Sequence, residues 1–272
     1  VEHFGSDLGG LRVAVDCANG AYAGVAPGVF ERLGATVTAV ADDPNGTNIN
    51  VGCGATDLSL LREVVAAGGH DLGVAFDGDG DRMLAVDAAG EPVDGDQILA
   101  VLALHLGVEL VAVTSMANLG LHRLLEERGI RVVTTDVGDR YVLEALRREG
   151  GVLGGEQSGH VIVLEGHVTG DGLAAALLLC ACLEGRSLAE AVAVMPRYAQ
   201  AKENVPAARP AVPARAAAEA ARLNEQLAGR GRILVRPSGT EPVVRVLAEA
   251  ETAEEASALC ASIARLVRDD SP

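Results

Sequence analysis

Three aspartates spaced two residues apart carry the clearest chemical signal in the sequence. Asp77, Asp79 and Asp81 follow the apolar run LGVAF and precede Arg82. In extended or looping backbone, residues at i, i+2 and i+4 can point the same way, and the intervening glycines let the backbone curl. Three converging carboxylates repel one another unless a cation neutralises them, and Mg²⁺ binds such oxygen ligands. The pattern predicts a magnesium site, with Arg82 placed to pair with an anionic substrate group.

Clusters of Asp and Gly also form ordinary solvated turns. Here the apolar segments LGVAF and MLAV flank the aspartates, which puts the charges at the end of a sheet, where α/β proteins bind ligands. A calcium loop of the EF-hand type needs Gly at its sixth position and Glu at its twelfth, and these positions are Arg82 and Ala88. A magnesium site is therefore favoured over both alternatives.

Composition limits the class of protein. The chain has 272 residues, 49% of them hydrophobic, and a formal net charge of −16. Such a negative charge argues against binding to nucleic acid or to anionic membranes, since both need a cationic surface. Five cysteines without metal-ligand spacing predict free thiols in a reducing cytosol. The most apolar stretch, residues 173–183, is too short to cross a bilayer, so a cytoplasmic protein is expected.

The elements that must position the aspartates alternate between strand and helix. This rhythm predicts two α/β domains with mixed sheets, followed by a smaller α+β C-terminal domain. The expected boundaries are residues 1–93, 94–196 and 197–272. A helix over residues 57–67, capped by Asp57, is expected before the aspartate loop. Residues 199–213, rich in Pro and Ala, are interpreted as a linker.

Three further loops carry candidate binding groups. In GEQSGH, Glu156 and Ser158 offer hydrogen bonds to sugar hydroxyls or an amine, and His160 is a possible acid/base group. In VGDRYV, Asp139 and Arg140 stand at an expected helix start, where anions bind. In RPSGTEP, a guanidinium, two hydroxyls and a Gly-rich turn suit a phosphate dianion. The candidate phosphate-binding residues there are Arg236, Ser238, Gly239 and Thr240, with Arg245 on the next strand.

Taken in this order, DGDGDR, VGDRYV, GEQSGH and RPSGTEP resemble the α-D-phosphohexomutase superfamily, and most closely its bacterial phosphoglucosamine mutase branch. The likeness extends over essentially the whole chain and includes DCANGA, PNGTNIN, VDGDQIL and VTGDG. It implies that Asp77, Asp79 and Asp81 bind Mg²⁺ and that Arg82 lies near the transferring phosphoryl group. It also implies sugar contacts from Glu156 and Ser158 and a non-reacting phosphate held by the RPSGTEP loop.

The reaction implied by the resemblance interconverts glucosamine 6-phosphate and glucosamine 1-phosphate, on the way to cell-wall precursors, through an enzyme phosphoserine. That serine belongs to an N-terminal domain with a TASHNP-like loop, and none of the serines in this chain has that setting. The first residue is Val rather than Met, so the serine domain is expected to be missing and the chain to be inactive alone.

Alternatives remain at this point. The phosphomannomutase/phosphoglucomutase branch shares the loops, and a non-catalytic phosphosugar-binding module would need no serine. A haloacid-dehalogenase-type phosphatase also uses Asp after a strand with Mg²⁺, but its Asp-x-Asp-x-Thr/Val pattern is absent. The expected partner is a phosphohexosamine substrate, and the sequence gives no oligomeric state.

Overall fold

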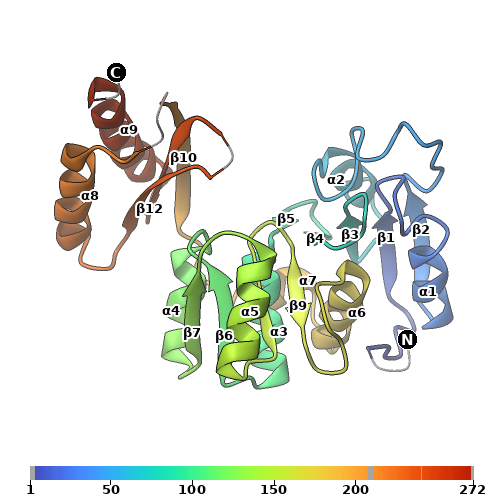
Figure 1. Ribbon diagram of the computed structural model, residues 1–272. Helices are drawn as coiled ribbons and strands as arrows, with labels where there is room; N and C mark the ends of the chain where they lie inside the picture. The colour runs from blue at the N-terminus through green and yellow to red at the C-terminus, as the bar shows by residue number, and fades with distance from the viewer. Residues whose placement is uncertain (1–3, 208–210, 240, 271–272) are drawn as a thin grey trace. The chain divides into compact units, whose positions relative to one another are not determined.

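The computed structural model describes residues 4–207, 211–239 and 241–270, and the chain divides into two compact units. The first unit comprises residues 1–117 and 121–196. The second comprises residues 118–120 and 197–272. Figure 1 shows the helices and strands of both units, with labels where there is room.

The first sheet of the first unit is mixed, with strand order β2-β1-β3-β4-β5. Its strands are β1 (Arg12–Asp16), β2 (Thr36–Val40), β3 (Leu72–Phe76), β4 (Met83–Asp87) and β5 (Pro92–Val93). β1 lies between β2 and β3 and pairs with both in parallel, whereas β4 is antiparallel to β3 and to β5. The connecting helices are α1 (Ala26–Arg32) and α2 (Ser59–Ala66).

The second sheet of this unit repeats the plan, with strand order β7-β6-β8-β9. Its strands are β6 (Leu110–Thr114), β7 (Arg131–Thr135), β8 (Leu153–Gly155) and β9 (Val161–Val163). β6 pairs in parallel with β7 and β8, and β9 returns antiparallel to β8. The helices of this part are α3 (Gly95–Leu106), α4 (Leu119–Glu127), α5 (Asp139–Glu149), α6 (Gly172–Leu183) and α7 (Leu188–Val192). The DGDGDR and GEQSGH loops thus occupy equivalent places, each at the turn from a parallel strand into an antiparallel one.

Continuous apolar runs form the core of the first unit. Every residue of β3 and of β6 is buried, as expected of parallel strands covered on both faces. A single hydrophobic cluster links Val13, Phe76, Leu99 and Leu179. α6, the most apolar segment of the sequence, is a largely buried helix, and none of the helices in the described ranges is both long and apolar enough to cross a membrane.

The second unit is a three-stranded antiparallel sheet with order β10-β12-β11, packed against two helices. Its elements are β10 (Ala199–Pro206), α8 (Ala214–Leu227), β11 (Arg232–Pro237), β12 (Val243–Ala250) and α9 (Ala253–Asp270). Val205, Ile233, Val246 and Ile263 belong to its separate core.

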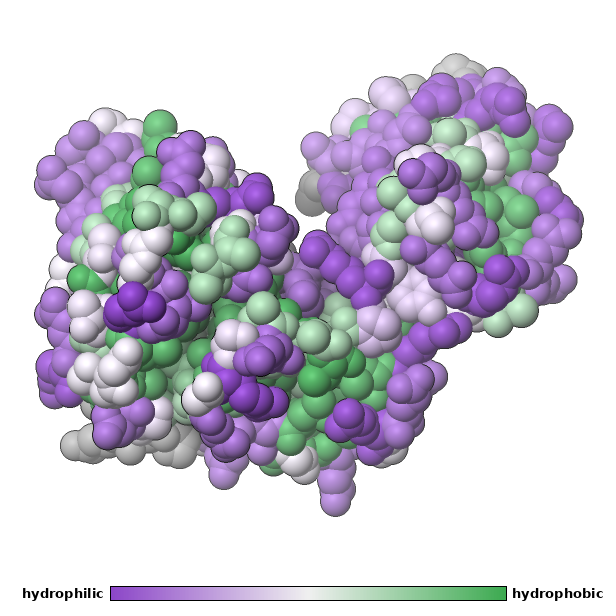
Figure 2. Space-filling view, turned by 180° about the vertical axis from the view of Figure 1, so that it is seen from behind, coloured by the Kyte–Doolittle hydropathy of each residue, from purple (hydrophilic) through white to green (hydrophobic). Residues whose placement is uncertain are grey.

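Figure 2 shows hydrophilic residues over much of the visible surface, with hydrophobic residues between them. Two mixed α/β sheets and a smaller α+β part confirm the predicted fold class.

Two local predictions are wrong. The linker expected over residues 199–213 begins as a strand, because β10 pairs along its whole length with β12. Its proline, Pro206, stands at the end of an edge strand, where a missing N–H costs little. The second error is the cap of α2. Leu58 occupies the N-cap position, and Asp57 accepts hydrogen bonds from the backbone N–H and the hydroxyl of Ser59 instead.

Candidate functional site

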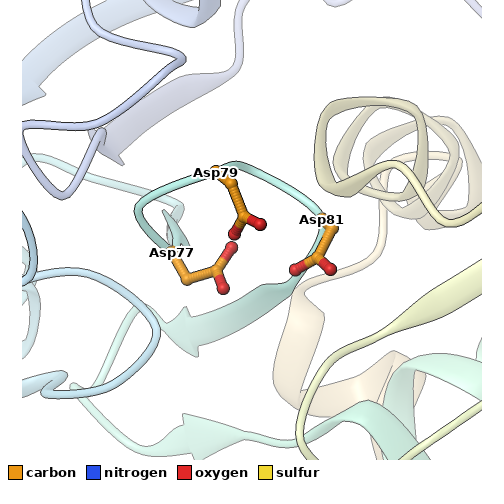
Figure 3. Close-up of side chains that lie close together, drawn as sticks. All are labelled: Asp77, Asp79 and Asp81. Atoms are coloured by element: carbon orange, nitrogen blue, oxygen red, sulfur yellow. The ribbon is translucent and has the colours of Figure 1, made fainter. Parts of the chain in front are cut away.

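The loop between β3 and β4 gathers the three aspartates that the sequence singles out. We call residues 77–82 the metal loop. The carboxylates of Asp77, Asp79 and Asp81 turn toward one another (Figure 3), and one oxygen from each lies within 4.8 Å of the others. Asp77 is buried, Asp81 is half-buried and Asp79 is exposed. The cluster therefore opens toward solvent on one side, where an ion and a ligand have access.

Arg82 and the loop backbone hold Asp77. The Arg82 Nε donates to Asp77 Oδ2 at 2.7 Å, and the backbone N–H groups of Gly80 and Arg82 donate to Asp77 Oδ1. Burial opposes ionisation here, but these Arg82 interactions outweigh it and keep the pKa of Asp77 below its ordinary value. Burial and the nearby Asp77 charge raise the pKa of Asp81. The loop thus concentrates negative charge that Arg82 neutralises only in part.

The donor set fits Mg²⁺. Oxygens bound to one Mg²⁺ at about 2.1 Å lie at most about 4.2 Å apart. One oxygen from each carboxylate lies within 4.8 Å of the others, a separation close to this limit. All three donors are hard carboxylate oxygens, which Mg²⁺ prefers over softer ligands. Asp77, Asp79 and Asp81 would therefore hold the cation.

The sugar loop, residues 155–160, lies directly beside the metal loop. The Met83 N–H donates to the carbonyl of Gly159 at 2.9 Å, and Arg82 forms an antiparallel bridge with His160. The buried His160 places Nδ1 3.4 Å from Asp81 Oδ2 and Nε2 3.8 Å from Asp139 Oδ2. His160 therefore lies between a metal-loop carboxylate and the start of α5.

Glu156 connects the sugar loop to the residue before α5. Its Oε1 accepts from the Gly138 N–H at 3.0 Å, and the exposed Ser158 hydroxyl donates to its Oε2 at 3.4 Å. Arg140 points elsewhere: its Nε lies 3.7 Å from Glu144, and its guanidinium stacks over the Tyr141 ring. The first unit thus brings together all of its predicted site residues except Arg140.

The remaining predicted residues belong to the second unit. We call residues 236–242 the phosphate hairpin. Arg236 on β11 is directly opposite Arg245 on β12, and side chains at directly opposite positions of an antiparallel pair lie on the same face of the sheet. Arg245 also pairs with Glu241 at 2.7 Å. Ser238 is buried and its Oγ accepts from the Glu241 N–H, Gly239 is exposed, and Thr240 lies outside the described residues.

Three residues next to the metal loop have no role predicted from the sequence. Asp16 is fully buried and accepts from the backbone N–H groups of Ala18 and Gly54. Burial raises the pKa of Asp16. Tyr22 and Asp171 are joined by a 2.7 Å hydrogen bond across 149 residues of sequence. All three lie in or beside the motifs DCANGA and VTGDG, so sequence alone signals that these segments matter but not how they meet.

A carboxylate triad beside a loop of hydrogen-bonding side chains, at strand ends of an α/β protein, is a typical ligand site. Models of the phosphoglucomutase/phosphomannomutase family match nearly the whole chain: α/β/α domain II over residues 4–90, α/β/α domain III over residues 94–198, and the C-terminal domain over residues 189–266. The chain belongs to the phosphoglucomutase/phosphomannomutase family.

Relatives named phosphoglucosamine mutase are similar over almost the whole chain. The one from Moorella thermoacetica is 50% identical over 96% of this chain and 62% of its own length. The one from Streptomyces griseus is 51% identical over 96% of this chain and 60% of its own length. This chain therefore spans about three fifths of the length of these relatives.

Solved structures share the fold. The Aspergillus fumigatus N-acetylphosphoglucosamine mutase, in complex with GlcNAc-6P and magnesium, superposes with a TM-score of 0.81 at 24% identity, over 96% of this chain and 62% of that one. A phosphomannomutase-like protein from Thermus thermophilus gives a TM-score of 0.73 at 25% identity, over 96% and 62% of the two chains. The mixed α/β architecture is thus that of known hexomutases.

Proposed function

We propose that this chain supplies the cation-binding and sugar-binding parts of a phosphoglucosamine mutase, which interconverts glucosamine 6-phosphate and glucosamine 1-phosphate. The observation that carries the proposal is the convergence of Asp77, Asp79 and Asp81 on one point beside the sugar loop. The names of the relatives at about 50% identity support the choice of hexosamine over hexose phosphates.

In this proposal each loop has a separate task. Asp77, Asp79 and Asp81 of the metal loop would hold Mg²⁺, which would supply positive charge to the phosphoryl group, a main requirement of phosphoryl transfer. Arg82, fixed by Asp77 and with 39% of its side chain exposed, pairs with a phosphoryl oxygen. Glu156 and Ser158 bind hydroxyl or amino groups of the sugar, and His160, flanked by two carboxylates, carries a proton to or from the sugar oxygen.

Arg236, Ser238, Gly239, Thr240 and Arg245 form the proposed site for the phosphate that does not react. The cross-strand register of Arg236 and Arg245 supports this role, because two arginines at neighbouring positions suit the several oxygens of a phosphate dianion. At the start of α5, Asp139 would orient the His160 imidazole, and Arg140 would have to leave Glu144 and the Tyr141 ring to pair with an anion.

The test of this function compares three ligands. Calorimetric titration of the purified 272-residue chain, with Mg²⁺ present, measures binding of glucosamine 6-phosphate, glucose 6-phosphate and mannose 6-phosphate. The proposal predicts the tightest binding for the glucosamine phosphate. Equal affinities, or a preference for mannose 6-phosphate, would contradict the hexosamine assignment. Absence of binding for all three would contradict the phosphosugar function itself.

A second measurement addresses the phosphoserine. None of the serines in these 272 residues lies in a TASHNP-like loop, so the proposal takes the phosphoserine from outside this sequence. The chain alone is expected to bind glucosamine 6-phosphate without converting it. Turnover by a preparation free of host mutase would refute this part of the proposal.

A further inference from the structure

Two segments that are far apart in the sequence hold the metal loop by backbone hydrogen bonds. The Ala21 N–H donates to the carbonyl of Gly78 at 2.9 Å, and the Gly172 N–H donates to the carbonyl of Gly80 at 2.9 Å. The carbonyls of the two loop glycines are therefore both satisfied by backbone outside the loop. Since the aspartates alternate with these glycines, holding the glycine carbonyls limits where the carboxylates point.

The Tyr22 ring lies against the middle of the loop. Gly80 has φ +81, and a Cβ added there would lie 2.5 Å from Tyr22 Cε2. The ring thus covers the backbone between Asp79 and Asp81. It also packs edge-on against Phe76, the last residue of β3, with ring centroids 4.9 Å apart.

Asp171 links the two holding segments. Its Oδ1 accepts from the Tyr22 hydroxyl at 2.7 Å and from the Ala174 N–H at 3.0 Å, which caps α6. Its Oδ2 lies 3.1 Å from His167 Nε2. Burial opposes ionisation, but the hydrogen bonds from Ala174, Tyr22 and His167 outweigh it and keep the pKa of Asp171 below its ordinary value. A charged carboxylate therefore accepts from Tyr22, and such bonds are stronger than neutral ones.

The start of α6 packs closely against the backbone of the metal loop. A Cβ on Gly172 would lie 2.8 Å from the carbonyl oxygens of both Gly80 and Arg82. The Asp171 cap fixes this helix start, and the helix start in turn fixes the loop backbone on both sides of Asp81.

We infer that Tyr22 and Asp171 are positioning residues that hold the metal loop in the shape in which its three carboxylates face one another. The inference rests on the proposed function, since it assumes that the loop binds a divalent cation. Neither side chain is a proposed ligand. Their effect passes through the loop backbone, as outer-shell contacts act on the ligands of many metal sites.

Tyr22→Phe tests the inference, because it removes one hydroxyl and keeps the ring. Mn²⁺ binding to the purified chain is measured by electron paramagnetic resonance, with Mg²⁺ as competitor. We expect Tyr22→Phe to bind Mn²⁺ about tenfold more weakly and to broaden the spectrum of the bound ion, while the chain without metal still unfolds cooperatively, at a somewhat lower melting temperature.

Matched variants separate positioning from general loss of stability. Tyr198→Phe removes the hydroxyl of another buried tyrosine, in the second unit, and should leave Mn²⁺ affinity unchanged. Asp171→Asn keeps a capping side chain but removes the charge, so it should weaken Mn²⁺ binding. Asp94→Asn makes the same change at the cap of α3, a helix of equal length, and should not.

The outcomes are distinct. If the wild type binds Mn²⁺ and Tyr22→Phe binds it equally well, the positioning role is wrong and the proposed metal site stands. If Tyr22→Phe does not fold, Asp171→Asn against Asp94→Asn decides in the same way. If the wild type binds neither Mn²⁺ nor Mg²⁺, the proposed metal site fails, and the inference fails with it.

Discussion

The metal loop and the phosphate hairpin contain similar short Gly-rich turns, but their surroundings differ. Backbone from residues 21 and 172 and the Tyr22 ring hold the metal loop, and a Cβ at Gly80 would collide with that ring. A Cβ at Gly239 would meet nothing within 4 Å. Contacts within the folded chain therefore shape the metal loop before any ligand binds. The turn of the phosphate hairpin is open at Gly239, although Ser238 beside it is buried.

This difference has a physical basis in the charges. Three carboxylates repel one another. A cation therefore binds more tightly when the folded protein already holds them close together before the cation arrives. A phosphate dianion accepts hydrogen bonds from mobile guanidiniums and backbone N–H groups in several arrangements. The metal loop and the phosphate hairpin therefore place unequal demands on the fold.

The largest expected effect comes from Gly80→Ala. The new methyl group would collide with Tyr22 at a residue with positive φ, so the free energy of unfolding should fall by about 3 kcal/mol. Mg²⁺ binding should be lost even where the chain stays folded. Urea denaturation without metal measures the first effect and calorimetry the second. A variant as stable as the wild type would contradict the described packing of this loop.

Asp81→Asn should have the next largest effect. It removes one of three carboxylate charges and should weaken Mg²⁺ binding roughly a hundredfold, because ligand charge sets cation affinity. Stability without metal should remain or rise, since repulsion with Asp77 contributes to the raised pKa of Asp81. Calorimetry and thermal denaturation check the two parts. Unchanged Mg²⁺ affinity would remove Asp81 from the ligand set.

Arg236→Lys tests the phosphate hairpin. Lysine keeps the charge but loses the two-pronged geometry of arginine, so binding of glucosamine 6-phosphate should weaken about tenfold. Affinity for Mg²⁺ alone should not change. Arg230→Lys is the control, because Arg230 is an exposed arginine of the same unit outside the hairpin. Equal losses in both variants would point to general electrostatics instead of a phosphate site.

The smallest expected effect is that of Gly239→Ala. With nothing near the added methyl group and no positive φ, the free energy of unfolding should change by less than about 0.5 kcal/mol. Denaturation of this variant beside Gly80→Ala gives the comparison directly. Similar losses of stability in the two variants would erase the distinction between a fold-shaped loop and an open one.

The sequence predicts features formed by neighbouring residues, but it does not predict contacts between residues that are far apart in the chain. The aspartates lie two residues apart in a Gly-containing loop between two apolar strands, so the sequence alone predicts that their carboxylates converge. The Tyr22–Asp171 contact spans 149 residues, and no local pattern encodes it. The sequence of β10 resembles a linker because an edge strand tolerates Pro and this one alternates small and polar residues. Only its pairing with β12 distinguishes it from a loop.

One calorimetric titration tests the central claim most directly. The purified 272-residue chain and the double variant Asp79→Asn/Asp81→Asn are titrated with Mg²⁺ under the same conditions. The account predicts one binding site per wild-type chain and none in the double variant. Equal binding by both proteins, or none by the wild type, would contradict the metal loop as the organising feature of this site.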